Sequence, residues 1–195
     1  MIAVTYRIQL EEPLLATSLE GEPNSAISFD YIPGSLTRGA VAGQLAQNGV
    51  DIAQHQRYLF FSRVVRYLNA YPVLEGETVR RLPTPASWKV KKLEAKKDDA
   101  QVQDFALLAE AERRATGQTK DLSGFTPGTD VDRTRYRPKH QIAVHTLRDR
   151  SAGRATQALG AVYRYDAITL GEVFLGAVIT QTADQADRVK ALLGN

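Results

Sequence analysis

The chain of 195 residues is 43% hydrophobic and 24% charged, with a formal net charge of +3. This composition is typical of one folded domain and argues against a disordered chain. The absence of cysteine excludes disulfides and thiolate catalysis and fits a reducing cytoplasm, and no apolar run is long enough to span a membrane.

The N-terminal part of the chain predicts a strand, a loop and a helix in that order. Apolar residues alternate with polar ones over residues 1–10, which predicts a strand. Residues 16–28 are polar and rich in turn-forming residues, so they predict a loop. The helix should begin with Ser35 as its N-cap and end at Asn48 and Gly49. Two glycines inside this helix would allow close approach of a sheet or of a ligand backbone.

The middle of the chain has weaker signals. Short strands are expected at 58–61 and 71–74, and two prolines make residues 82–88 extended. The following stretches predict a lysine-rich linker at 89–97, an amphipathic helix at 99–116 and a long loop at 117–139.

The last third of the chain is more regular. Residues 158–168 and 172–181 predict two strands joined near Leu170 and Gly171, and a final helix should begin at Thr182 or Asp184. The order of these elements resembles the β-α-β-β-α-β pattern of a ferredoxin-like α+β fold that lacks its last strand. We therefore expect a single domain with a core of about 1–75 and 140–195 and an insertion of about 76–139. The natural protein would continue beyond this sequence, or a partner chain would supply the missing strand.

The opening of the first helix has the features of an anion site. Backbone N–H groups at a helix N-terminus attract phosphate, and Gly34 would let a ligand backbone approach closely. Ser35 and Thr37 would add hydroxyl donors, and Arg38 is close enough in sequence to reach the same anion. Many such openings only cap a helix, so this segment alone leaves both interpretations open.

Charge is concentrated in two basic blocks. Residues 57–97 carry 10 basic and 3 acidic side chains, and residues 133–154 carry 7 basic and 1 acidic. Aromatic residues interleave with the cations, a combination typical of surfaces that hold single-stranded RNA, although solvated loops can show it too. Trp88 could equally cover the core. The candidate RNA-binding residues of the blocks are Arg63, Arg66, Arg80, Arg81, Trp88, Lys89, Lys91, Lys92, His145, Arg148, Arg150 and Arg154.

Catalytic motifs are scarce. His140 and His145 are five residues apart, but no cysteine or acidic cluster near them in sequence completes a metal site, so we expect no metal and no cofactor. Neither a Walker motif nor a nucleophile elbow occurs. His145 and Asp30 are the only plausible catalysts of an endoribonuclease, and a structural or RNA-contacting role is the more common one for such residues.

Taken together, these segments resemble the RAMP superfamily of CRISPR-associated proteins, most closely the RAMP subunit of type III-D effector complexes. The first stretch is similar to the family's Ile-Pro-Gly-Ser-x-x-Arg-Gly helix opening. The four stretches that carry the resemblance are 30–42, 69–72 with 82–89, 145–150 with 153–154, and 160–168 with 171–176. The resemblance implies an RRM-like fold and binding of CRISPR RNA (crRNA) near its 5′ tag, within a multisubunit antiviral complex.

The sequence thus predicts a cytoplasmic, non-catalytic crRNA-binding scaffold subunit. Its partners would be crRNA and other CRISPR effector subunits, with target RNA contacted indirectly and no membrane. Two alternatives remain open: a RAMP endoribonuclease that cuts repeat or target RNA, and a protein–protein adaptor whose basic surface binds acidic neighbours.

Overall fold

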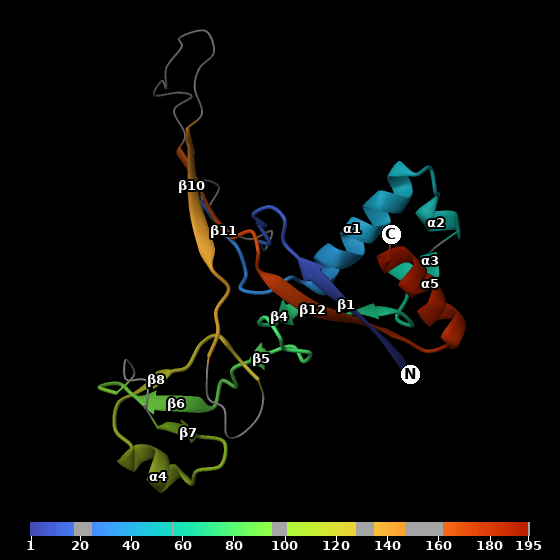
Figure 1. Cartoon of the computed structure of the whole chain (residues 1–195). Helices are drawn as coiled ribbons and strands as arrows, with labels where there is room; N and C mark the ends of the chain where they lie inside the picture. The colour runs from blue at the N-terminus through green and yellow to red at the C-terminus, as the bar shows by residue number, and fades with distance from the viewer. Residues whose placement is uncertain (18–24, 56, 95–100, 128–134, 147–161, 195) are drawn as a thin grey trace. The chain divides into compact units, whose positions relative to one another are not determined.

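The computed structural model describes residues 1–17, 25–55, 57–94, 101–127, 135–146 and 162–194. These residues form two compact units, one of Met1–Arg80 with Pro138–Asn195 and the other of Arg81–Arg137 (Figure 1). The fold is mixed α/β, with several mainly antiparallel sheets and few helices. The second unit lies within the segment that the sequence sets apart as an insertion. No helix in the described ranges is long and apolar enough to cross a membrane.

The first unit contains a sheet built around β12 (Val173–Thr180). One edge of β12 pairs antiparallel with β1 (Ile2–Gln9) along its whole length. The other edge pairs with two short strands, β3 (Arg66–Tyr67) and β4 (Tyr71–Pro72). The strands predicted near the two ends of the chain are confirmed, and β4 is a shorter form of the strand expected at 71–74.

A second sheet of the first unit has the order β10–β11–β2. The strands β10 (His140–Thr146) and β11 (Val162–Ile168) are antiparallel, and β2 (Ser25–Ile27) runs parallel to β11. The predicted strands at 158–168 and 172–181 are confirmed as β11 and β12, and the chain turns between them at Leu170 and Gly171. The two strands do not pair with each other, because β1, β3 and β4 occupy the edges of β12. Neither β10 nor β2 was predicted; β2 lies in the expected loop at 16–28.

Two helices pack on the first sheet: α1 (Gly34–Gln47) contacts β3, and α5 (Ala183–Leu193) contacts β1 and β12. Their buried faces meet the sheet in a core formed by Val4, Val41, Leu59, Phe60, Val65, Val178, Ala186 and Val189. Both helices were predicted. The α5 start is confirmed at Thr182, whose side chain and that of Gln185 form a capping box. The predicted end of α1 is also confirmed, since Asn48 is its C-cap and Gly49 follows with φ of +79°.

Two short helices, α2 (Ile52–His55) and α3 (Arg57–Phe60), follow α1. The strand expected at 58–61 is therefore wrong. Leu59 and Phe60 are adjacent in sequence and both buried, which one turn of helix allows here, whereas adjacent residues of a strand point to opposite faces.

The second unit contains a three-stranded sheet of order β7–β6–β8 and a separate pair of strands. The helix predicted at 99–116 is mostly wrong, because Val102 pairs with Val90 in the sheet and only a short helix remains. The linker predicted at 89–97 and the loop at 117–139 also contain strands. The elements are β5 (Leu82–Pro83), β6 (Trp88–Lys91), β7 (Val102–Asp104), α4 (Glu110–Ala115), β8 (Thr119–Asp121) and β9 (Phe125–Thr126).

Candidate functional site

A cavity of about 480 Å³ lies at the N-terminal end of α1, in the first unit. It is bounded by the first turns of α1 on one side and by the segment 62–67, which ends in β3, on the other. The lining residues are Gly34, Ser35, Arg38, Ser62, Arg63, Val65, Arg66 and Tyr67. Five of them are residues that the sequence proposed as RNA-binding, drawn from the helix opening and from the first basic block.

The start of α1 leaves a backbone donor at this cavity. The helix begins at Gly34 after Pro33, so the predicted N-cap role of Ser35 is wrong, and no side chain caps the helix. The Gly34 N–H donates to Asn69 Oδ1 at 3.0 Å, and the Leu36 and Thr37 N–H groups donate to the Pro33 carbonyl. Among the described residues, the Ser35 N–H finds no acceptor, and it is therefore available to an anion in the cavity.

Gly34 serves the chain's own packing. A Cβ at this position would lie 2.2 Å from the Tyr67 carbonyl oxygen, so the helix start can approach β3 only because residue 34 has no side chain. The close approach expected at Gly39 and Gly43 does not involve the sheet, since a Cβ at either would meet nothing within 4 Å. The glycine that the fold requires is thus the first residue of the helix.

Thr37 is buried rather than presented to the cavity, with 7% of its surface exposed. Its hydroxyl lies beneath the helix, near the hydroxyl of Tyr6, but outside hydrogen-bonding geometry. Burial raises the pKa of the Tyr6 hydroxyl, which the Thr37 hydroxyl and Arg80 partly offset. Burial also raises the pKa of Tyr67 to about 12, with a further rise from Tyr6 and an opposing effect of Arg38. Both phenols therefore stay neutral at neutral pH, and Tyr67 is the one that lines the cavity.

Three arginines at the cavity lack a compensating acid. Arg38, Arg63 and Arg66 are all exposed, and no carboxylate lines the cavity. Among the described residues, no carboxylate pairs with any of the three, and α1 has no acidic residue in its first turn. All three side chains line the cavity, and Arg66 also donates from Nη2 to Met1 Sδ at 3.5 Å. Cations near a helix N-terminus oppose the helix dipole, and a bound anion would offset this. The arrangement suits a phosphate group.

Most other residues of the first basic block are less available to bind RNA. Arg80 donates to the Asn69 carbonyl at 3.1 Å and lies over the Tyr71 ring at 5.3 Å. Arg81 is only 5% exposed, so its predicted surface contact with RNA is not supported. In the second unit, Trp88 donates a hydrogen bond to Asp104, and Lys89 forms an ion pair with Asp121. The pKa of Asp104 is lowered by hydrogen bonds from Ser87, from the Ala106 amide and from Trp88. Lys91 and Lys92 are exposed.

The second basic block is described only in part. Arg148, Arg150 and Arg154 lie outside the described residues. His145 lies on β10, where its exposed ring is 5.4 Å from the ring of Tyr165 on the neighbouring strand. This contact places His145 in an aromatic group rather than beside an acid.

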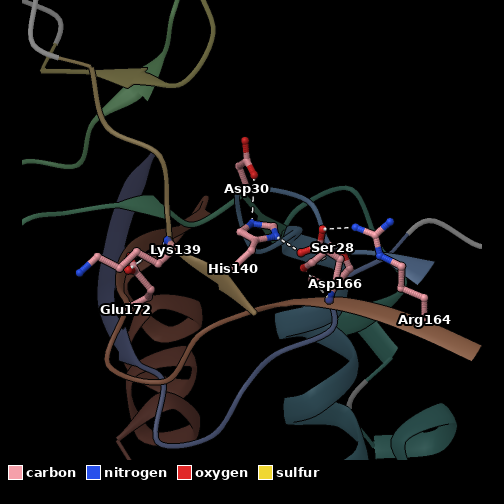
Figure 2. Close-up of polar contacts among 8 residues, drawn as sticks. Ser28, Asp30, Lys139, His140, Arg164, Asp166 and Glu172 are labelled. Carbon is pink, nitrogen blue, oxygen red and sulfur yellow. Dashed lines mark hydrogen bonds and ion pairs between the residues drawn. The ribbon is translucent and has the colours of Figure 1, made fainter. Parts of the chain in front are cut away.

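His140 forms a polar cluster that the sequence did not predict. Its Nδ1 lies 2.9 Å from Asp166 Oδ1, and its Nε2 lies 3.1 Å from Asp30 Oδ1, within ion-pair distance but not aligned as a hydrogen bond (Figure 2). Asp166 Oδ2 also lies 3.8 Å from Arg164 Nη2. The cluster ties the start of β10 to β11 and to the segment before α1. No spacing in the sequence indicates it, because the register of β10 with β11 brings His140 close to Asp166, and Asp30 comes from the segment between β2 and α1.

The proposed catalytic pair is not brought together by this arrangement. Asp30 contacts His140, whereas His145 lies five residues further along β10 and, by the alternation of a strand, on its opposite face. Both ring nitrogens of His140 face carboxylates, which leaves neither nitrogen directed at a substrate. The cluster is therefore better suited to holding the sheet against the helix opening than to acid–base catalysis.

No family model matches this chain, and no curated protein matches it.

Proposed function

We propose that this protein is a non-catalytic scaffold subunit that holds crRNA within a type III CRISPR effector complex, near the 5′ tag of the guide. The observation that carries the proposal is the cavity at the start of α1, which Arg38, Arg63 and Arg66 line without an acidic partner among the described residues. Guanidinium groups with a free backbone N–H bind phosphate in a way that does not depend on base sequence. Other effector subunits would be its protein partners, and target RNA would be contacted through the guide.

The finer description of the fold belongs to the same proposal. We propose that the first unit is a ferredoxin-like RAMP domain and that the second unit is an insertion in it. The antiparallel β1–β12–β3 sheet with α1 and α5 packed on it supports this assignment, as does the order of the elements. A cytoplasmic location follows from the same proposal.

The test is the affinity for crRNA as a function of salt, measured by fluorescence anisotropy with the purified chain. Replacing Arg38, Arg63 and Arg66 by alanine should weaken binding to all RNA sequences alike. The slope of log affinity against log salt should fall by about 0.7 for each phosphate that the protein no longer neutralises. Arg57→Ala is the control for each single arginine substitution, because it removes one positive charge from α3, outside the lining of the cavity.

An unchanged affinity and an unchanged salt slope in the triple variant would overturn the proposal. The same samples also separate the alternatives, because a nuclease would shorten repeat RNA or guide-matched RNA in the course of the incubation. Cleavage that disappears in Asp30→Ala or His145→Ala would support the endoribonuclease. Retention of other effector subunits by a chain that binds no RNA would support the adaptor.

A further inference from the structure

The three-stranded sheet β10–β11–β2 has one face on which aromatic rings gather. In an antiparallel pair, residues that lie opposite one another share a face, so His145 and its partner Tyr163 lie on the same side as Tyr165. The ring of His145 is 5.4 Å from the ring of Tyr165, at an interplanar angle of 47°. His145, Tyr163 and Tyr165 thus define an aromatic face of this sheet.

Small residues flank the central ring of this face. Tyr165 lies on β11, the middle strand of the sheet, and its register partners are Ala143 on β10 and Ala26 on β2. Tyr165 remains 36% exposed and His145 is exposed, because the described helices pack on the other sheet of the unit. The rings therefore project beyond the small side chains of the neighbouring alanines, which leaves room for a flat group to lie against the rings.

The opposite face of the same sheet has a different character. It carries Ile27, Ile142, Val144 and Val162, each more than half exposed. It also carries the acidic residue Asp166 and the basic residue Arg164, 3.8 Å apart. The described residues of the aromatic face include no carboxylate. The described part of the aromatic face thus has no acidic residue to repel a polyanion.

We propose that the aromatic face binds unstacked bases of single-stranded RNA, with Tyr165 and His145 as stacking surfaces and Tyr163 as a further ring along the strand. Residues two apart on a strand are separated by about 6.6 Å, roughly twice the 3.4 Å between stacked bases, so splayed bases match the rings and duplex bases do not. The inference deepens the proposed function, because it adds base contacts to the phosphate contacts of the cavity. Aromatic stacking of this kind is tolerant of sequence.

The test compares two short single-stranded RNA probes of equal length, one of mixed sequence and one with abasic sites, which carry the same phosphates. The full chain should bind the base-containing probe more tightly. Tyr165→Val should weaken binding of that probe roughly 5-fold to 100-fold, as expected when one base loses its stacking partner. It should leave the affinity for the abasic probe unchanged. Tyr165→Phe keeps the ring and should retain the affinity of the original chain for both probes.

Val144→Ala is the matched control, because it changes the same sheet on the opposite face and should alter neither affinity. Equal binding of the two probes by the original chain would overturn the inference. An equal loss for both probes in Tyr165→Val would also overturn it, because loss of folding or charge would act on both. If Tyr165→Val instead left RNA binding intact and reduced the protein chains that co-purify, the face would be a protein interface.

The two proposals can fail separately. The cavity variant Arg38→Ala, Arg63→Ala, Arg66→Ala should weaken binding of base-containing and abasic RNA alike, because it removes phosphate contacts. If the cavity variant binds both probes more weakly and Tyr165→Val does not change binding, the scaffold function stands and the stacking face is overturned. If Tyr165→Val weakens binding of the base-containing probe and the cavity variant binds both probes normally, the stacking face stands and the role of the cavity is overturned.

Discussion

Gly34 occupies the most restricted position at the start of α1. A Cβ there would lie 2.2 Å from the carbonyl oxygen of Tyr67 and 2.9 Å from the carbonyl carbon of Leu68, both of which are backbone atoms that cannot rotate away. We expect Gly34→Ala to lower the free energy of unfolding by about 1–3 kcal/mol, because the helix start must move away from β3. Urea denaturation followed by circular dichroism measures this change.

Gly39 in the same helix provides the control. It is exposed, and a Cβ at this position would meet nothing within 4 Å. Gly39→Ala should therefore raise the free energy of unfolding by about 1 kcal/mol, since alanine has the higher helix propensity. Equal effects of the two substitutions would contradict the close packing of Gly34 on β3.

At the scale of single elements, α5 begins with a side-chain cap. Thr182 accepts a hydrogen bond from the Gln185 N–H at 3.4 Å, and the Gln185 side chain accepts from the N–H of Thr182 and of Gln181. Thr182→Ala should destabilise the protein by about 1 kcal/mol through loss of the cap, while Thr182→Ser should have little effect. Thermal denaturation of the two variants tests this, and a loss of the same size in both would argue against the capping role.

Local signals explain which elements could be predicted. The alternation of β1 and β12, the C-terminal end of α1 and the start of α5 depend on neighbouring residues, so the sequence contains them directly. The strands β2, β6 and β7 are only three or four residues long and depend on partners elsewhere in the chain. Val102 shows the difference: its spacing suits an amphipathic helix, yet it is paired with Val90 in a sheet. Tertiary pairing overrides local preference at such positions.

The residues of the candidate site also fall into two groups, those that a local sequence pattern indicates and those that it does not. Gly34, Ser35 and Arg38 could be proposed from the sequence because they open one helix. The basic block that contains Arg63 and Arg66 also contains Arg81, and composition alone could not separate two exposed arginines from a buried one. That distinction depends on the path of the chain before and after β3. The contacts of His140 and the aromatic face depend on the register of β10 with β11, which no local pattern encodes.

At the scale of the whole molecule, the chain is divided between two compact units that are interleaved in sequence. The first unit is closed by the pairing of β1 with β12, strands from opposite ends of the chain. The second unit has apolar residues of its own, and Val90, Leu122 and Phe125 are each less than 9% exposed. Separate buried groups of this kind allow one unit to lose structure before the other.

The only tryptophan, Trp88, lies in the second unit and so reports on that unit alone. Phe125→Ala removes a side chain that is 4% exposed and should destabilise this unit by about 3–5 kcal/mol, the usual cost of deleting a buried ring. The fluorescence transition of Trp88 in urea should therefore move to lower denaturant, while amide exchange in β1 and β12 stays slow. If exchange in β1 and β12 accelerated to the same extent, the two units would unfold as one cooperative structure. The second unit could then not be treated as a separate insertion.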